Sequence, residues 1–461
     1  MRCASCLVYC SRMKSIDRAR LQSLMQREQK KFVDERPKSK ALFERAQKSL
    51  LAGVPMNWMV KWAGAFPPFV REAQGAHFFD VDGHRYADFC LGDTGAMTGH
   101  SPFSTVKAVE EQARRGITLM LPGEDSIFVA EELQKRFNLP YWQFALTATD
   151  ANRFSIRVAR QITGRPKILV FNWCYHGTVD ETLITLDRVA GPRPGNIGPP
   201  VNPAVTSKVV EFNDVDALEA ALHSDDVACV LAEPAMTNVG IVHPQPGFHQ
   251  ALREITREHG TLLIIDETHT ICAGPGGYTR AENLEPDVIV FGKAIGAGIP
   301  GAAYGFSQEV AERVAAKLEV ETCDVGGIGG TLAGNALSLA AMRATLTKVL
   351  TNEAFGRMIP LAERWTTGVA KALADAELPW HVTRLGCRAE YLFAPKAPIN
   401  GSEAHQAMDF ELERFMHLYT MNRGILLTPF HNMALMSPQT EKEDVERHTK
   451  VFREAVRELA A

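Results

Sequence analysis

Short apolar runs alternate with amphipathic stretches through the middle of the chain, from about residue 101 to about residue 350. Two of the clearest runs, residues 262–265 and 288–291, contain no polar residue. Strands of this kind are buried on both faces, as in a parallel sheet that is covered by helices. The alternation therefore predicts an α/β domain with a mainly parallel sheet and helices on both of its faces.

The chain before this domain, residues 16–100, predicts helices followed by a small sheet. Its first part is helical and highly charged; Pro37 interrupts it, and Ser39 is a plausible N-cap for the helix that follows. Alternating residues on both sides of the Asp82-Gly83 pair predict a β-hairpin. We interpret residues 1–15 as a disordered leader rather than a metal site, because no second cysteine pair follows their CxxC.

The end of the chain, residues 351–461, changes to long helices and a few strands. The pattern predicts a long helix from about residue 358, strands at 381–384 and 388–393, one helix over 402–422 and another after residue 441. We predict a small α+β domain here, separate from the large domain of residues 101–350.

The whole sequence has the composition of a globular enzyme. Its 461 residues, 46% hydrophobic and 23% charged, are enough to bury a large core. The formal net charge of −4 gives no reason to expect a nucleic acid or an anionic membrane as a partner, and no apolar run approaches the roughly 20 residues of a membrane span. The nine cysteines are scattered and odd in number, which argues against a disulfide framework and favours a cytoplasmic protein.

Two polar residues at the ends of the buried runs are candidates for catalysis. Asp266 follows the first run directly, and Lys293 follows the second run after one glycine, within a stretch of small residues. Open α/β sheets collect ligands at the carboxyl ends of their strands, so we expect both side chains in one cleft. A lysine there can form a Schiff base, and a carboxylate can keep a pyridine nitrogen protonated. The alternative is that Asp266 caps a helix and Lys293 is an ordinary solvated lysine.

These residues lie in motifs that resemble a known enzyme family. LLIIDETHT and PDVIVFGKAIGAGIPGAAYG carry Asp266 and Lys293, AEPAMTNVG precedes them, and FFDVDGHRYADF lies nearer the N-terminus. Together they resemble the class III aminotransferases that depend on pyridoxal 5'-phosphate, most of all the branch containing glutamate-1-semialdehyde aminomutase. The resemblance covers nearly the whole chain. It implies fold type I, in which a large domain binds the cofactor and both ends of the chain build a small domain.

The resemblance also implies which residues surround the cofactor. Lys293 would form the Schiff base, and Asp266 would bind the ring nitrogen. The turn ALTATD would hold the phosphate through Ala148 and Thr149, although relatives have glycine where this chain has Ala148. An ordinary helix N-cap is the alternative for this turn.

The ring would lie between Tyr175 and Thr268. Tyr175 belongs to an aromatic-His-Gly signature with His176, and relatives have valine at the position of Thr268. His269 stands where relatives have glutamine or methionine near the phenolic oxygen of the ring. We expect His269 either to donate a hydrogen bond to that oxygen or to be a packed histidine.

Three further residues follow from the resemblance alone. Asn238 would lie beside the same phenolic oxygen, and Glu233 would brace the site without touching the cofactor. Thr331, in GGIGGTLAGN, would reach the phosphate of the neighbouring subunit. Each site would then be complete only in a homodimer.

These residues together predict an aminotransferase. In such an enzyme a small amino donor reacts first and a carbonyl acceptor second, and Lys293 transfers the proton in each step. Two other activities share the motifs: an aminomutase, which moves the amino group to an adjacent carbon, and an ammonia-lyase or racemase that acts on an amino acid or amino alcohol. The loop at residues 178–204 and the segment VPMNWMVKW lack patterns that we associate with the aminomutase, which favours the aminotransferase. The retained lysine argues against a non-catalytic relative.

Substrate recognition is predicted from a strand of the small domain and from the segment VPMNWMVKW. Alternation places Arg388 on the side of its strand away from the apolar face, where a guanidinium could grip a carboxylate or phosphonate. Arg384 is its rival on the same face, and a solvated surface pair of Arg388 with Glu390 is the alternative. The resemblance places Trp58 and Lys61 at the entrance of the site. Their alternative is a loop whose tryptophans only fill a surface groove.

Overall fold

The computed structural model describes residues 16–317 and 324–461, and the predicted leader, residues 1–15, lies outside them. The chain divides into two compact units. Unit 1 contains the chain up to Asp93, Gly356–Ala397 and Ala407–Ala461; unit 2 contains Thr94–Phe355 and Pro398–Gln406. The sequence predicted boundaries near residues 100 and 350, and it did not predict that residues 398–406 would belong to unit 2.

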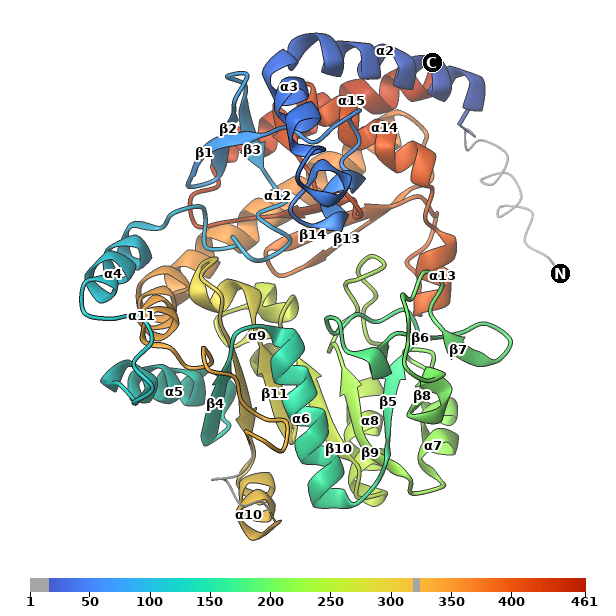
Figure 1. Cartoon of the computed structure of the whole chain (residues 1–461). Coiled ribbons are helices and arrows are strands. Elements are labelled where there is room, and N and C mark those ends of the chain that lie inside the picture. Colours follow the sequence, from blue (N-terminus) through green and yellow to red (C-terminus); the bar gives the residue numbers. More distant parts are fainter. Residues whose placement is uncertain (1–15, 318–323) are drawn as a thin grey trace, which may run out of the picture. The chain divides into compact units, whose positions relative to one another are not determined.

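Unit 2 is built around a seven-stranded sheet (Figure 1). In spatial order the strands are β4 (Tyr141–Ala145), β12 (Ala302–Phe306), β11 (Val288–Phe291), β10 (Leu262–Asp266), β9 (Val227–Ala232), β5 (Lys167–Phe171) and β8 (Ser207–Val210). Only β12 runs against the others, since its pairings with β11 and β4 are antiparallel. Every residue of β9, β10 and β11 is buried, as their apolar sequences predict. The predicted α/β class with a mainly parallel sheet is confirmed.

Helices cover this sheet. The longer helices of unit 2 are α4 (Phe103–Ala113), α5 (Glu124–Phe137), α6 (Ala148–Thr163), α7 (Val215–Leu222), α8 (Phe248–Glu258), α10 (Gln308–Lys317) and α11 (Ala336–Ala344). The short elements are α9 (Gly277–Ala281), α13 (Gly401–Gln406), η3 (Asp180–Thr182), η4 (Pro203–Val205), η5 (Thr270–Ala273), η6 (Lys293–Gly296), η8 (Thr345–Val349) and the hairpin of β6 (Ile184–Leu186) and β7 (Ala190–Pro192). Helix α6 crosses one face of the sheet (Figure 1), and its residues Ala151, Ile156 and Ile162 are buried in the core there.

Unit 1 combines both ends of the chain in two small sheets. One sheet contains β1 (Val70–Gln74), β2 (His77–Asp80), β3 (Arg85–Asp88) and β15 (Ile425–Leu426); the other contains β13 (His381–Leu385), β14 (Arg388–Leu392) and β16 (Met433–Leu435). Its helices are α2 (Arg18–Glu35), α3 (Pro37–Ala46), η1 (Leu51–Gly53), η2 (Asn57–Lys61), α12 (Asn352–Asp375), α14 (Phe410–Met421) and α15 (Lys442–Ala460). Because β15 pairs with β3, the last part of the chain completes a sheet that the first part begins.

Two predictions of helix boundaries are wrong. Ser39 is not an N-cap, because α3 already begins at Pro37, a position where the missing N–H of proline costs nothing. The carboxylate of Asp82, in the predicted hairpin turn, accepts hydrogen bonds from the N–H groups of Lys38 (2.7 Å) and Ser39 (2.9 Å) instead. The single helix predicted over residues 402–422 is two helices, α13 and α14, and Asp409 caps the second by accepting from the Leu412 N–H.

Membrane-spanning helices and disulfides were two features that the composition argued against. No helix within residues 16–317 and 324–461 is both long and apolar enough to cross a membrane. The cysteines at positions 90, 174, 229, 272 and 387 are all buried and carry free thiols.

Candidate active site

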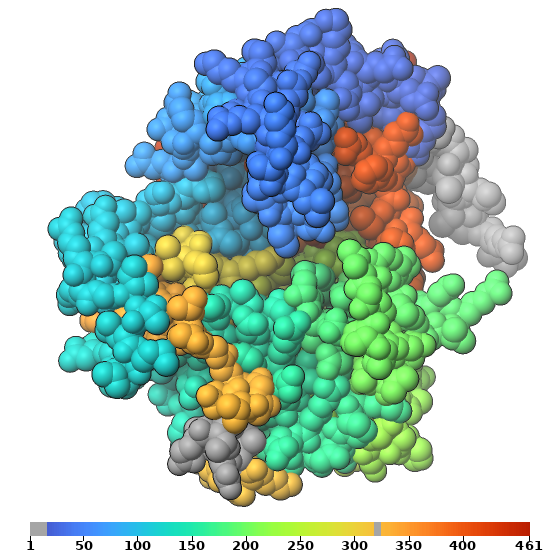
Figure 2. All heavy atoms as spheres, in the orientation of Figure 1, coloured from blue at the N-terminus to red at the C-terminus, as the bar shows by residue number. Residues whose placement is uncertain are grey.

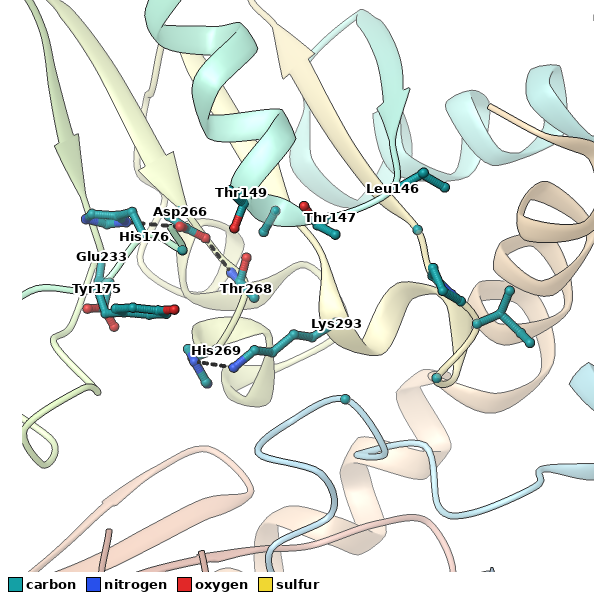
Figure 3. Close-up of a pocket in the computed structure, with 17 residues that line it drawn as sticks. Leu146, Thr147, Thr149, Tyr175, His176, Glu233, Asp266, Thr268, His269 and Lys293 are labelled. Carbon is teal, nitrogen blue, oxygen red and sulfur yellow. Dashed lines mark hydrogen bonds and ion pairs between the residues drawn. The ribbon is translucent and has the colours of Figure 1, made fainter. Parts of the chain in front are cut away.

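The neighbouring strands β10 and β11 bring the two candidate catalytic residues to one edge of the sheet. Asp266 is the last residue of β10, and Lys293 follows β11 after Gly292; the two strands are parallel. Both side chains line a cavity of about 410 Å³ (Figure 3). Its other walls are formed by Gly95, Leu146, Thr147, Ala148, Thr149, Tyr175, His176, Gly177, Glu233, Thr268, His269, Gly298, Ile299, Pro300 and Gly301.

The backbone at Lys293 has an uncommon conformation. Its φ is +49°, in the left-handed region that costs free energy for any residue other than glycine. Gly292 before it has no side chain, and a Cβ added there would come 2.9 Å from the Cβ of Ala148. This close approach brings the end of β11 against the start of α6. The lysine side chain then extends into the cavity, where its Nζ lies 2.8 Å from Nε2 of His269 (Figure 3).

Asp266 is 5% exposed and has three polar neighbours. Its Oδ2 lies 3.0 Å from Nδ1 of His176 and accepts a hydrogen bond from Nδ2 of Asn152 (2.9 Å), and its Oδ1 accepts from the Thr268 N–H. Burial raises the pKa of Asp266, but the hydrogen bond and positive charge of His176, with Thr268 and Asn152, outweigh burial and lower that pKa to about 2.

The pKa of His176 is shifted in the opposite direction to that of Asp266. Burial lowers the pKa of its imidazole, but its contacts with Cys174 and Asp266 raise that pKa above its ordinary value. Asp266 and His176 therefore form a buried ion pair, with a carboxylate that remains ionised at neutral pH. A carboxylate of this kind can keep a pyridine nitrogen protonated.

The N-terminus of α6 forms another wall of the cavity. Thr147 is the N-cap, and its hydroxyl accepts from the Asp150 N–H at 3.1 Å. The N–H groups of Ala148 and Thr149 open the helix, and such groups have no partner within a helix, so together with the helix dipole they favour an anion. Gly177 packs directly against this turn: a Cβ there would lie 2.0 Å from Oγ1 of Thr149.

Four other predicted residues also line the cavity. They are Tyr175, Glu233, Thr268 and His269 (Figure 3). Tyr175 is 40% exposed, whereas Glu233 is buried and accepts a hydrogen bond from the Thr237 N–H at 3.0 Å. The resemblance thus selected side chains from several separate segments that do meet in one place.

Asn238 and Thr331 do not line this cavity. The amide of Asn238 donates to the backbone carbonyl of Trp173 at 3.1 Å. Thr331 lies on the surface of unit 2, five residues before α11 begins at Ala336. Their predicted contacts with the phenolic oxygen and with a second subunit stay predictions.

The predicted substrate residues all belong to unit 1. Trp58 meets Phe430 edge to face with ring centroids 6.4 Å apart, and Lys61 places its Nζ 5.2 Å from the centre of the same ring. Arg388 is 0% exposed and Glu390 is also buried, because both faces of β14 are covered. The alternative of a solvated Arg388–Glu390 surface pair is therefore wrong, as is the assignment of only one buried face to this strand.

Sequence reasoning missed Asn152 and Thr94. Asn152 lies one helical turn after Ala148 on α6, so the spacing from the predicted phosphate turn could have indicated it. Thr94 places its Oγ1 2.9 Å from Nδ1 of His269, although the two residues are 175 positions apart. No local pattern indicates a contact over such a separation.

Comparisons with known proteins identify the family. The model of the family described as aminotransferase class-III matches residues 59–455. The chain belongs to this family. It is 34% identical over 432 residues to glutamate-1-semialdehyde 2,1-aminomutase 2 of Exiguobacterium sibiricum, covering 90% of this chain and 95% of that protein.

Solved structures of class III enzymes are also similar. A glutamate-1-semialdehyde-aminomutase from Pseudomonas aeruginosa is 51% identical with a TM-score of 0.95, covering 97% of this chain and 100% of that chain. An omega-transaminase from Sphaerobacter thermophilus is 29% identical with a TM-score of 0.83, covering 92% and 98%. These neighbours confirm fold type I for this class III chain.

The class III chain is an enzyme that depends on pyridoxal phosphate. The cavity fits this cofactor in three respects: an ionised carboxylate deep in the wall, an anion site at the start of α6, and a lysine amine within the space. The replacement of glycine by Ala148 does not close the anion site, because the Cβ of Ala148 packs against Gly292.

Proposed function

We propose that this class III enzyme is an aminomutase of the glutamate-1-semialdehyde type, which moves an amino group between adjacent carbons of one substrate. The observation that carries this proposal is the similarity to proteins named for that activity, over nine-tenths or more of the chain. It reverses the preference for an aminotransferase that the sequence motifs gave. The cavity supports either activity, because both need one lysine, one ring-binding carboxylate and one phosphate site.

Several side chains and two backbone N–H groups would hold the cofactor. Lys293 would bind it covalently, Asp266 would bind the ring nitrogen, and the N–H groups of Ala148 and Thr149 would bind the phosphate. Tyr175 and Thr268 would flank the ring. When bound, pyridoxal phosphate supplies an aldehyde that captures amines and a ring that accepts electrons from the substrate carbon.

The residues of the chain would move the protons. Once the substrate amine has replaced Lys293 on the cofactor, the Nζ of Lys293 would be a free amine. That amine can remove a proton from the substrate carbon that bears the nitrogen and return the proton to a neighbouring atom. His176 and Asn152 would hold the Asp266 carboxylate in place and in its ionised form throughout. In an aminomutase these same residues would act twice on one substrate molecule before the product is released.

An aminotransferase is the second candidate, and specific observations favour it. The loop at residues 178–204 and the segment VPMNWMVKW differ from the patterns that we associate with the aminomutase. The similarity to the omega-transaminase also extends over nearly the whole chain. The two candidates differ in whether the first product leaves before the amino group returns.

One experiment separates these candidates. The holoenzyme is supplied with glutamate-1-semialdehyde and no other amine or carbonyl compound, and the position of nitrogen in the product is followed by NMR. An aminomutase forms, over many turnovers, the isomer with nitrogen on the terminal carbon. Turnover that starts only when a second carbonyl compound is added would select the aminotransferase, and release of ammonia would select the lyase.

Lys293→Ala tests the proposed centre itself. We expect the variant to lose turnover and the absorbance of covalently bound cofactor, because the lysine supplies both the bond and the base. Lys167→Ala, on the same sheet but outside the cavity, is the matched control. If Lys293→Ala kept full activity, this lysine would not be the nucleophile.

We also propose that the enzyme works as a homodimer, as the resemblance implies. Unit 2 exposes several large apolar side chains, at Phe103, Met120, Leu121 and Ile127, which single subunits of soluble proteins rarely gather on one surface. Their segment, residues 103–127, forms a cyan surface in Figure 2. Thr331 is exposed on the same unit, as a contact to a second subunit requires.

Thr331→Ala tests the shared site. It should weaken cofactor binding by roughly 1.5–3 kcal/mol, the value of a hydrogen bond to a charged acceptor. Mixed dimers in which one chain carries Lys293→Ala and the other Thr331→Ala give the decisive measurement. In a shared site one of the two sites carries both defects and the other carries neither. Two sites that each carry one defect would exclude sharing.

A further inference from the structure

A line of three side chains in unit 2 ends on the catalytic lysine. The Nζ of Lys293 lies 2.8 Å from Nε2 of His269, and Nδ1 of His269 lies 2.9 Å from Oγ1 of Thr94. Lys293 and His269 line the cavity, whereas Thr94 lies behind His269, is 0% exposed and does not line the cavity. Figure 3 shows the imidazole of His269 pointing at the end of the lysine side chain.

In the ammonium form of Lys293, the chemistry of these groups determines the direction of each hydrogen bond. A protonated lysine amine has three N–H donors and no acceptor, so Nε2 of His269 must be the acceptor. A neutral imidazole that accepts at Nε2 carries its hydrogen on Nδ1. That hydrogen points to the hydroxyl of Thr94, which accepts it. The ammonium group of Lys293 therefore selects the tautomer of His269 with its hydrogen on Nδ1, and the Thr94 hydroxyl anchors the ring in that form by accepting this hydrogen.

The backbone at Thr94 supports a specific placement of this hydroxyl. Thr94 has a φ of +82°, which is a rare conformation for a residue with a branched Cβ. The three residues before it, Leu91, Gly92 and Asp93, also have positive φ values, between 44° and 58°. Strained backbone of this kind clusters at sites where a side chain must be held in one position.

We propose that His269 is a positioning residue that holds the amine of Lys293 whenever the lysine is not bonded to the cofactor, and that Thr94 anchors the imidazole of His269 for this task. The proposal rests on the proposed function, because it takes Lys293 as the amine that bonds pyridoxal phosphate. A lysine side chain has four rotatable bonds, and without such a contact its amine would sample many positions. The contact keeps the nitrogen at one place in the cavity, from which it can bond the cofactor again once the ammonium group has lost a proton.

The first test uses the formation of the covalent bond rather than turnover. Apoenzyme is mixed with pyridoxal phosphate in a stopped-flow instrument, and the absorbance of covalently bound cofactor is followed. Thr94→Val should slow bond formation about tenfold, because one hydrogen bond in the line is lost. Thr94→Ser, which keeps the hydroxyl, should restore most of the rate.

Thr98→Val is the matched control. Thr98 lies in the same loop, is also fully buried, and its hydroxyl donates to the carbonyl of Gly99 and not to a histidine. We expect it to bond the cofactor at the rate of the parent enzyme. Equal slowing by Thr94→Val and Thr98→Val would mean that loss of any buried hydroxyl in this loop disturbs the fold, and it would overturn the proposal.

The second test reads the tautomer directly. The ¹⁵N shifts of histidine in the apoenzyme distinguish a hydrogen on Nδ1 from one on Nε2, and His269→Gln identifies the signals of His269. The proposal expects the Nδ1–H form in the parent and in Thr94→Ser, and in Thr94→Val it expects the Nδ1 signal to move to the shift of a hydrogen that has lost its acceptor. An Nε2–H form in the parent would overturn it, because Nε2 could then not accept from Lys293.

Substitution of His269 itself separates holding the lysine from shaping the cavity. His269→Gln keeps an acceptor oxygen and should bond the cofactor within about threefold of the parent rate, whereas His269→Leu should be slowed about tenfold or more. Equal rates for both variants would overturn the proposal. Failure of Lys293 as the bonding amine would look different: covalent bonding would then persist in Lys293→Ala, and all of these variants would bond the cofactor at one rate. Failure of the aminomutase activity would appear only in the product formed from glutamate-1-semialdehyde, and it would leave these rates of bonding unchanged.

Discussion

Asp266 in unit 2 and Glu413 in unit 1 are carboxylates of equal exposure, 5% each, with opposite shifts in pKa. Burial is the largest influence on both and raises both pKa values. At Asp266 the hydrogen bond and charge of His176 outweigh burial and lower the pKa to about 2. At Glu413 the negative charge of Glu390 adds to burial, and together they raise the pKa to about 7. The partner, and not burial, decides the charge of a buried carboxylate.

The difference separates a fixed charge from a variable one. Asp266 keeps its negative charge over the whole neutral range, which suits a group that must hold a cofactor nitrogen protonated. Glu413 gains or loses its charge within that range, because Lys61 and Arg414 only partly offset the influence of Glu390. We therefore expect changes at Asp266 to affect catalysis and changes at Glu413 to affect stability.

Asp266→Asn should have the largest effect. An amide cannot keep the ring nitrogen protonated or pair with His176, so we expect kcat to fall about a thousandfold, or about 4 kcal/mol, while the cofactor stays bound. Steady-state kinetics and cofactor absorbance measure the two properties. A rate within about threefold of the parent would exclude the role of Asp266, and it would also make its low pKa irrelevant to function.

Glu413→Gln should change how stability depends on pH. Between pH values of about 4.5 and 7 the folded protein binds the proton of Glu413 more tightly than the unfolded chain does, so wild-type stability falls as the pH rises through this range. The loss attributable to Glu413 is about 3 kcal/mol, and the glutamine variant should lack it. Denaturant midpoints at pH 5 and pH 8 measure this difference. Glu443→Gln, which changes an exposed carboxylate on α15, should keep the wild-type pH dependence.

Asn152→Ala tests the weaker support of Asp266. Asn152 donates both to Asp266 and to the backbone carbonyl of His176, so its loss should loosen the ion pair without removing a charge. We expect kcat to fall about tenfold and the pH profile to keep its shape. Asn152→Asp should do more damage, because it places a second negative charge beside Asp266. Parent-like kinetics for both variants would mean that His176 alone holds the carboxylate.

Arg388→Lys should have the smallest effect, and it tests whether the buried polar groups of unit 1 contact the substrate. If Arg388 binds an acidic group of the substrate, KM for acidic amino compounds should rise about fivefold, with little change for uncharged amines. Small and equal changes for both classes would assign Arg388 to the interior of unit 1. Trp58 and Lys61 would then be the remaining candidates for recognition.

The sequence by itself determined the main elements of the candidate active site. Two strands without polar residues had to be buried in a parallel sheet, and parallel strands end at one edge, so Asp266 and Lys293 were predicted together from local pattern alone. The turn before α6 was predicted in the same way, because small hydroxyl residues between a strand and a helix mark a helix N-terminus. The motifs of the family then added Tyr175, His176 and Thr268, which a search of periodicity could not have selected.

Only the tertiary structure decided the partners and the burial of these groups. Asn152 meets Asp266 across 114 positions and Thr94 meets His269 across 175, and no local rule predicts contacts between such distant residues. Arg388 was predicted to face outward because its strand alternates, yet every residue of β14 is buried, so both of its faces are covered. Period-two alternation distinguishes the two faces of a strand. Which faces are buried depends on what the rest of the chain packs against them.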